Sequence, residues 1–390
     1  MSSDWAKLCD QNLDLVLEKL VASSDYLRFS LVCKSWHSAA KDYQRRGKMS
    51  TFDHHPPMLL ISTGKNGIWR LYNVMNDRIF DLKLKLSNKR FCGSSKGWLI
   101  AMDKSFTVTL TNPFVRAKGG RMKENSIIRL PPLIPQDPDD LVGWAHAPNY
   151  FLLKATLSAD PILDANNCIV LIIYEDQCQM AFIRLNKDPT WTYVYQHWNG
   201  IEEVVHVEDS FYAVTIRNYL IGFDITSQSN SDEKLVAKRR APDHPQKTYL
   251  VNPNEKELWM VHKHIDIEDD KTQVTYEFKI FELDYEKGKW SAKKTLGDVA
   301  LFLGDNSSIS VLASKFPGCQ PNCIYFSHDD TRVAHDVGPH GPHDFGVYNV
   351  ASGSFHFGVF NITSESGTCI RKLIKKSRSP PIWVVPKIQL

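Results

Sequence analysis

Short apolar or aromatic stretches that end in Asp or Asn recur along most of the chain, and this repeat constrains the fold more than any other feature. Six of them are clear, at residues 69–73, 108–112, 182–186, 221–224, 281–284 and 345–349. Asn73 and Asn112 lie 39 positions apart, and Asn186 and Asp224 lie 38 apart. The 74 positions from Asn112 to Asn186 are near twice that period, and the later spacings of 60 and 65 indicate loop insertions. The terminal Asp or Asn suits a turn, because its side chain can accept hydrogen bonds from nearby backbone amides.

A period near forty residues with about four strands per unit is typical of a β-propeller blade, which buries its faces against its neighbours. The length fits six or seven blades. Closure of a propeller requires both ends of the domain to share a blade, and the apolar stretches 58–61 and 382–385 are placed to do so. A β-sandwich would leave the repeat unexplained. The sequence therefore predicts a mainly β protein with a propeller over residues 58–390.

The first 48 residues differ, because their apolar residues recur at helical spacing. Behind Asp10, which can cap free amide donors, a first amphipathic helix is indicated by Leu13, Val16, Leu17, Leu20 and Val21. A second helix, expected to begin just after Ser24, carries an apolar stripe of Phe29, Val32, Cys33, Trp36 and Ala40. About forty residues cannot bury such faces internally, so the stripes predict a docking surface. A linker at residues 49–57 separates this module, residues 1–48, from the propeller.

The apolar spacing of this module resembles an F-box, the helical unit that docks on a Skp-type adaptor of cullin ubiquitin ligases. The resemblance rests on Leu8-x(4)-Leu13-x(2)-Val16-x(3)-Leu20, on Leu27-Arg28, and on Val32-Cys33-Lys34-x-Trp36. The first half departs from the family pattern at Cys9, Gln11 and Asn12. The resemblance implies that the adaptor-binding surface is formed or supported by Leu8, Leu13, Val16, Leu20, Leu27, Val32, Cys33 and Trp36. Packing of the same residues as a small cap on the rest of the chain remains an alternative.

The propeller region resembles the C-terminal domain of a large plant group of F-box proteins with a kelch-like propeller. The matching segments are 97–99 (Gly-Trp-Leu), 111–114 (Thr-Asn-Pro-Phe), 128–133 (Ile-Arg-Leu-Pro-Pro-Leu), 154–158, 322–326 and 381–386. This resemblance implies a substrate-recognition subunit of an SCF-type ubiquitin ligase. The subunit would bind a Skp-type adaptor, through it a cullin, and an unknown protein substrate on the propeller. Catalysis would belong to the partners, so we expect no enzymatic activity.

Two other functions stay open from the sequence alone. A propeller hydrolase acting on sugars would need convergent carboxylates or a metal at the propeller opening, and a channel lined by apolar and amide groups would exclude it. A propeller interaction scaffold that is not coupled to a ligase is the second alternative, favoured by the departures at Cys9, Gln11 and Asn12.

The charge and the termini restrict the partners and the location. A formal net charge of +3 is too weak to drive nucleic-acid or membrane binding, so neither partner is expected. The N-terminus does not resemble a secretory signal, which predicts a cytoplasmic and/or nuclear protein with reduced cysteines. The longest apolar run, residues 168–174, is far shorter than a membrane-spanning helix and reads as a buried strand. The basic run at 371–378 is either an exposed loop or a weak nuclear import signal.

No motif predicts a catalytic, cofactor or metal site. Cys319 and Cys323 with the four histidines that follow could supply zinc ligands, but their spacing is irregular and Cys323 lies inside an apolar strand, which favours a buried thiol. Those histidines are His328, His335, His340 and His343. Ser38-x-x-Lys41 matches a nucleophile pattern without any companion motif, so we attribute it to chance.

Overall fold

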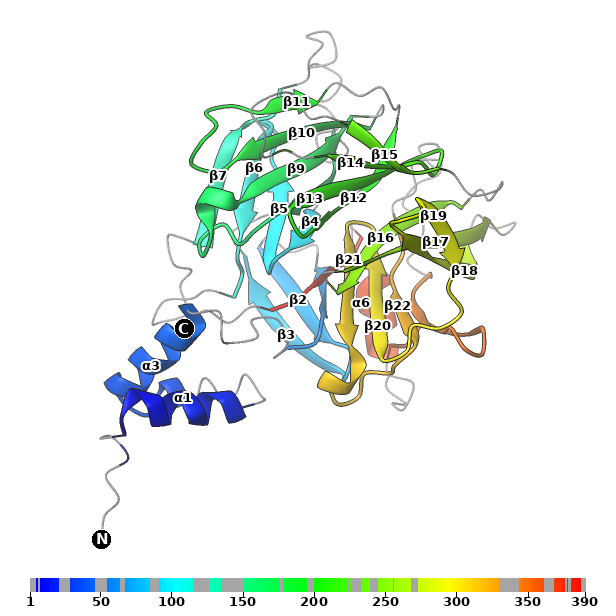
Figure 1. Ribbon diagram of the computed structural model, residues 1–390. Coiled ribbons are helices and arrows are strands. Elements are labelled where there is room, and N and C mark those ends of the chain that lie inside the picture. The colour runs from blue at the N-terminus through cyan, green and yellow to red at the C-terminus, as the bar shows by residue number, and fades with distance from the viewer. Residues whose placement is uncertain are drawn as a thin grey trace.

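The chain folds into a six-bladed β-propeller preceded by a small helical module (Figure 1). The computed structural model describes residues 5, 8–20, 29–45, 55–63, 67–84, 91–114, 126–134, 151–175, 178–194, 200–223, 225, 233–238, 245–254, 256–267, 273–329, 344–360, 368–375, 377 and 380–386. The prediction of a mainly β fold is confirmed, and the blade count is six.

The first three blades have four strands each, in the following order from the centre outward. The first blade consists of β25 (Ile382–Val384), β1 (Met58–Ser62), β2 (Ile68–Asn73) and β3 (Arg78–Lys83). The second consists of β4 (Phe91–Ser95), β5 (Trp98–Met102), β6 (Thr107–Thr111) and β7 (Ile127–Pro132). The third consists of β8 (Leu152–Leu157), β9 (Ile169–Tyr174), β10 (Gln179–Arg184) and β11 (Thr192–Val194).

The last three blades include one with a fifth strand. The fourth blade consists of β12 (Ile201–Val207), β13 (Ser210–Thr215), β14 (Leu220–Phe223) and β15 (Glu233–Ala237). The fifth consists of β16 (Lys247–Asn254), β17 (Glu257–Ile267), β18 (Gln273–Asp284) and β19 (Lys289–Ala292). The sixth consists of β21 (Ser307–Leu312), β20 (Val299–Gly304), β22 (Cys323–Phe326), β23 (Gly346–Asn349) and β24 (Ser354–Phe357).

The repeat in the sequence marks the same strand of every blade. Its six members lie in or directly after β2, β6, β10, β14, β18 and β23, each of which is the second strand from the outer edge. The terminal side chains act as the turn chemistry predicts: Asn73 accepts the amide of Met75, and Asn112 accepts the amide of Phe114. The long step from Asn112 to Asn186 contains no additional blade, because β6 and β10 belong to neighbouring blades.

The spacings of 60 and 65 arise partly from strands and not only from the expected loop insertions. In the fifth blade β17 and β18 are eleven and twelve residues long, which lengthens the repeat unit. In the sixth blade the extra strand β21 folds back on β20, and β20 then lies parallel to β22. The sequence pattern therefore underestimated the strand content of the fifth and sixth blades, which depart from four short strands.

Six hydrophobic clusters fill the spaces between neighbouring blades. Each cluster draws its buried side chains mainly from two adjacent blades, and together the clusters cover all six junctions around the ring. The apolar run at 168–174 contains β9, whose residues are all buried in two of these clusters, as expected. Because every blade buries both faces, the fold is stable only if the ring closes.

Closure is made by β25, which pairs antiparallel with β1 through Leu60, Leu59 and Met58. Trp383 in β25 is fully buried, and its indole donates a hydrogen bond to the carbonyl of Leu303, 3.0 Å away. The predicted sharing of one blade by both ends is thus confirmed. The innermost strands also approach closely: a Cβ on Gly93 of β4 would lie 2.2 Å from the carbonyl oxygen of Ala155 in β8.

The helical elements are few among the described residues. α1 (Asp10–Lys19) and α3 (Lys34–Arg45) form the N-terminal module, and α6 (Thr368–Lys375) packs Ile370 and Ile374 into the cluster between the first and sixth blades. Two 3-10 turns occupy Ala165–Asn167 and Ala313–Lys315. In this part of the chain no helix has the length and apolar character needed to span a membrane.

The expected second helix does not run unbroken from Ser24. Phe29 and Ser30 are helical, the chain then turns, and α3 begins at Lys34. The turn forms because the amide of Val32 bonds back to the carbonyl of Phe29 three residues earlier, while the carbonyl of Cys33 accepts the first bond of α3 from His37. This interruption moves Val32 off the buried stripe and leaves it exposed.

Closure by β25 predicts a large loss of stability when its aromatic anchor is removed. Trp383→Ala leaves a cavity beside Phe302 and Phe360, whose rings lie 5.1 Å and 5.3 Å from the indole, and should cost about 3–5 kcal/mol of unfolding free energy. Phe80→Ala in β3 is the control, because Phe80 is 47% exposed and its loss should cost less than about 1 kcal/mol. Urea denaturation of both variants measures the difference, and equal midpoints would contradict the role assigned to β25.

Candidate functional site

The N-terminal module has its own small hydrophobic core. Leu13 and Leu17 of α1 pack against Phe29 and against Ala40 and Tyr43 of α3, and all five side chains are buried. Trp36 stacks obliquely on Phe29 with ring centroids 4.4 Å apart and donates a hydrogen bond to the carbonyl of Trp5. Figure 1 shows α1 and α3 next to each other and clear of the blades.

The structure separates the predicted docking residues into three groups. Leu13 is fully buried and can only support the surface from beneath, whereas Val32 is 53% exposed. Five more are partly buried: Cys33, and four residues that pack against the core, namely Leu8, Val16, Leu20 and Trp36. Leu27 lies outside the described residues.

Sequence periodicity missed two exposed aliphatic side chains of this module. Leu31 is 80% exposed in the turn next to Val32, and Leu15 is 59% exposed on α1. Leu31 did not fit the helical stripe, because the prediction assumed a continuous helix through the turn. The signal was present in the sequence as two adjacent aliphatic residues, Leu31 and Val32, beside a polar segment.

The departures from the F-box pattern lie on the surface. Cys9, Gln11 and Asn12 are all exposed. The backbone at Cys9 has φ −71° and ψ 158°, which is close to the φ that a proline imposes. The backbone at Cys9 therefore has the conformation that a proline would have before α1.

A second cluster of functional groups lies in the propeller, where the innermost strands begin. Lys263 of β17 is fully buried, and its ammonium nitrogen lies 2.8 Å from Asp329 Oδ2 and 2.8 Å from Asp344 Oδ2. Tyr249 donates its hydroxyl to Asp329, and Thr275 donates its amide and hydroxyl to Asp344. Burial alone would lower the pKa of Lys263, but the two carboxylates outweigh it and raise that pKa above its ordinary value. Burial, followed by the Asp329 charge, raises the pKa of Tyr249 well above its ordinary value.

A further ion pair joins the third and fourth blades at the same end of the ring. The ammonium of Lys154 on β8 contacts the carboxylate of Glu203 on β12, and both side chains are buried. Burial lowers the pKa of Lys154 and raises the pKa of Glu203, so desolvation disfavours both charges and their mutual attraction offsets part of that cost. Glu202 accepts the amide of Thr248 on β16 at 2.8 Å, which links the fourth and fifth blades.

The turn between β20 and β21 extends this polar ring toward the second blade. Asn306 donates from its side chain to the carbonyl of Phe91, the first residue of β4, at 3.1 Å and to Asp305 at 2.6 Å. The ammonium of Lys247 lies among the carboxylates of Asp305, Asp329 and Glu202, which outweigh burial and raise the pKa of Lys247. Lysines and carboxylates therefore cross-link neighbouring blades at this end of the ring.

A propeller opening lined only by apolar and amide groups would have excluded the hydrolase alternative. The described residues do not have such a lining, because several carboxylates gather at this end of the ring. Each of the carboxylates in this network is held by a lysine, a tyrosine, an asparagine or a backbone amide, an arrangement that favours a cross-link between blades.

The sequence-level metal and nucleophile candidates do not assemble into sites among the described residues. No group of three or more potential metal ligands occurs in this part of the chain, and His335, His340 and His343 lie outside it. Cys323 is buried in β22, and burial raises the pKa of Cys323 to about 11 and that of Cys319 to about 12, which disfavours thiolates. Ser38 and Lys41 are exposed on α3.

Comparison with known proteins agrees with both regions. The F-box domain model matches residues 5–46, and the KIB1-4 beta-propeller model matches residues 71–349. Among curated relatives from Arabidopsis thaliana, F-box protein At5g55150 is 26% identical over 359 residues, covering 89% of this chain and 91% of the relative. F-box protein SKIP23 is 22% identical, covering 90% of each chain, and F-box/kelch-repeat protein At1g57790 is 26% identical, covering 77% of each.

The buried Lys263 cluster predicts a stability that falls in alkaline solution. The folded-state pKa values of Lys263 and Tyr249 are raised, so their contribution is fully present below their unfolded values of about 10 and is lost as the pH rises above them. Lys263→Met removes the buried ammonium that contacts both Asp329 and Asp344 and should cost about 3–5 kcal/mol near neutral pH. Denaturant unfolding from neutral to alkaline pH measures both effects.

Lys287→Met is the matched control for this prediction. Lys287 also pairs with a carboxylate, that of Asp284, but its side chain is 72% exposed, so its removal should leave the unfolding midpoint nearly unchanged. Equal behaviour of the two variants would contradict a structural role for the buried cluster.

Proposed function

The chain belongs to the KIB1-4 beta-propeller family of F-box proteins, and from this premise we propose that it is the substrate-recognition subunit of an SCF-type ubiquitin ligase. The N-terminal module would bind a Skp-type adaptor and, through it, a cullin. The propeller would hold the target protein. F-box proteins are generally non-catalytic adaptor subunits, and the proposal assigns ubiquitin transfer to the partners.

The observation that carries the docking half is the exposed pair Leu31 and Val32. The described core of the module contains Leu13, Leu17 and Phe29 but neither Leu31 nor Val32. Both aliphatic side chains are exposed and are therefore open to contact with a partner. Adjacent apolar side chains in water favour burial against a partner by roughly 1.5–3 kcal/mol each. Leu8, Val16 and Trp36 lie at the margin of the same core and would extend the contact.

The mechanism of such a subunit is proximity. A target bound to the propeller is held near a ubiquitin-loaded enzyme, which raises the effective concentration of its lysines without chemistry by this chain. The proposal places the protein in the cytoplasm, the nucleus or both, where cullin ligases would meet it. No specific observation favours the hydrolase over this function.

The docking surface predicts a selective loss of adaptor binding. Replacing Leu31 and Val32 by Asp should weaken binding to a Skp-type adaptor more than about tenfold, because the contact would have to bury two charges, while the fold stays intact. Ile216→Asp is the control, since Ile216 is 61% exposed on the propeller. Co-purification of the full chain with adaptor and cullin, with circular dichroism of each variant, provides the measurement.

Leu13→Ala should behave differently from the surface variants. Leu13 is a core residue, so its truncation should weaken adaptor binding by destabilising the module rather than by removing a contact. Undiminished adaptor binding by the Leu31 and Val32 double variant would sink the docking proposal and favour a scaffold that is not coupled to a ligase.

A further inference from the structure

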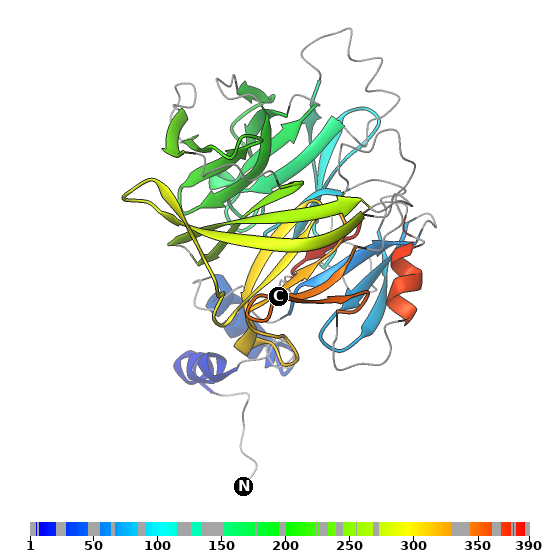
Figure 2. The same cartoon turned by 90° about the vertical axis from the view of Figure 1, so that its right-hand side faces the viewer.

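The fifth blade has a long strand whose outer edge is only partly covered. β18 has twelve residues, whereas its outer neighbour β19 has four and pairs only with residues 281–284. Within the described part of the chain, no strand pairs with the outer edge of β18 from Gln273 to Lys279. Figure 2 shows the long β17–β18 hairpin crossing the face turned to the viewer.

The direction of the backbone groups along this edge follows from one hydrogen bond. The carbonyl of Ile280 points toward β19, because it accepts the amide of Lys293 at 2.8 Å. Successive residues of an antiparallel strand alternate in direction, so Phe278 presents its amide and carbonyl to the same side, beyond the end of β19. A bulge at Tyr276, which has no partner between the pairs His264–Glu277 and Ile265–Thr275, ends the regular edge.

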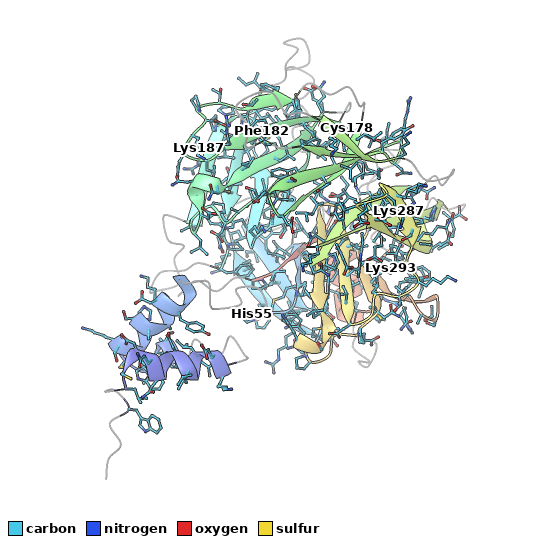
Figure 3. All side chains as sticks on the ribbon, viewed as in Figure 1. His55, Cys178, Phe182, Lys187, Lys287 and Lys293 are labelled. Carbon is cyan, nitrogen blue, oxygen red and sulfur yellow. The ribbon has the colours of Figure 1, made fainter. Side chains whose placement is uncertain are left out.

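A cavity of about 710 Å³ lies along this same edge. Its walls come from residues 277–281 of β18, from residues 292–294 at the end of β19, and from Tyr348 of the sixth blade and Asn218 of the fourth. We call it the β18 notch. Lys293 at its rim is labelled in Figure 3.

Two features of the β18 notch specify the chemistry of its occupant. Lys279, Lys293 and Lys294 line it. Lys279 pairs with Glu277 at 3.3 Å and Lys293 pairs with Glu282 at 2.9 Å, so the excess positive charge of the walls is that of Lys294. Asn218 is 6% exposed, and its buried side-chain amide oxygen accepts no hydrogen bond from the residues that the structure describes. The notch thus offers the amide and carbonyl of Phe278, lysine charge and the side-chain amide oxygen of Asn218 as an acceptor for a peptide amide.

We propose that the β18 notch binds an extended acidic segment of a target protein, which adds to the fifth blade as a strand beside Phe278. Backbone hydrogen bonds to β18 would supply affinity independent of sequence, and the lysines would select acidic side chains. This inference rests on the proposed function in one respect, namely that the bound segment belongs to a target of the ligase. Lysines and a bulge are also devices that keep sheet edges from pairing, so self-association of two copies is the competing outcome.

The test uses the full chain and a defined probe, an eight-residue peptide of alternating Glu and Val with an N-terminal fluorescein. Fluorescence anisotropy should show binding that weakens about tenfold or more in the Lys279→Glu, Lys294→Glu double variant, because two attractive charges become repulsive. Lys256→Glu is the matched control, because Lys256 is an exposed lysine of the same blade outside the notch. Amide hydrogen exchange should slow in β18 when the peptide binds.

A second probe separates strand addition from simple charge attraction. The same peptide with every backbone amide methylated keeps its side chains but cannot donate hydrogen bonds, and should bind about tenfold more weakly. Equal binding of both peptides, unchanged exchange in β18, or equal effects of the notch and Lys256 variants would each overturn the proposal. A dimer in sedimentation velocity that the double variant abolishes and the peptide does not displace would assign the edge to self-association instead.

The ligase proposal is tested separately from the notch. The Lys279 and Lys294 double variant should still co-purify with a Skp-type adaptor, because the substitutions lie far from the N-terminal module in the sequence. Loss of peptide binding with adaptor binding retained is the expected result for this variant. Failure of wild-type peptide binding with adaptor binding retained would remove the notch and leave the ligase proposal standing.

Discussion

Closure of the ring by a three-residue strand is the constraint on which the rest of the structure depends. Each of the six hydrophobic clusters lies between two blades, so no blade completes its core without both neighbours. The pairing of β25 with β1 joins chain segments more than 300 residues apart, and the ordering of that loop must be offset by burial around Trp383. A local defect at this junction therefore affects all six interfaces, which is why cooperative unfolding is expected of the propeller.

Buried charges reinforce the ring at the end where the innermost strands begin. Desolvation makes an isolated buried ion pair a weak source of stability, yet in this network each charge also bonds to a different blade. Lys154 with Glu203 joins the third and fourth blades, and Lys263 with Asp344 joins the fifth and sixth. If one blade shifted relative to its neighbour, these charges would be left unpaired. The network therefore contributes more to the specific arrangement of the blades than to the free energy of unfolding.

The sequence predicted those features that repeat locally and missed those set by distant contacts. Asn73, Asn112 and Asn349 each end a strand and accept amides within the next three residues, so a local turn signal was enough to find one strand of every blade. The fifth strand of the sixth blade has no such signal, because β21 repeats no motif and takes its place only by folding back on β20. The partners of Lys263 lie more than 60 positions away, and a lone lysine in a strand gives no indication of them. In the N-terminal module, helical periodicity found the core but extended the second helix through the turn at Leu31, so this aliphatic residue, which is 80% exposed, was overlooked.

The balance between covered and open surfaces distinguishes the two regions for which we propose binding. The propeller buries the faces of all its sheets, so binding energy is available mainly from edges, loops and the ends of the ring. The helical module is too small to bury all its apolar residues, so Leu31 and Val32 remain exposed once the core of Leu13, Leu17 and Phe29 is formed. An apolar surface suits a constant partner such as an adaptor, because burial of aliphatic groups is strong and needs no particular sequence of charges. A charged strand edge suits a variable partner, because the backbone supplies contacts common to any extended segment while lysines discriminate between segments. Division of these two chemistries between the two regions is what a subunit that links one ligase to selected targets requires.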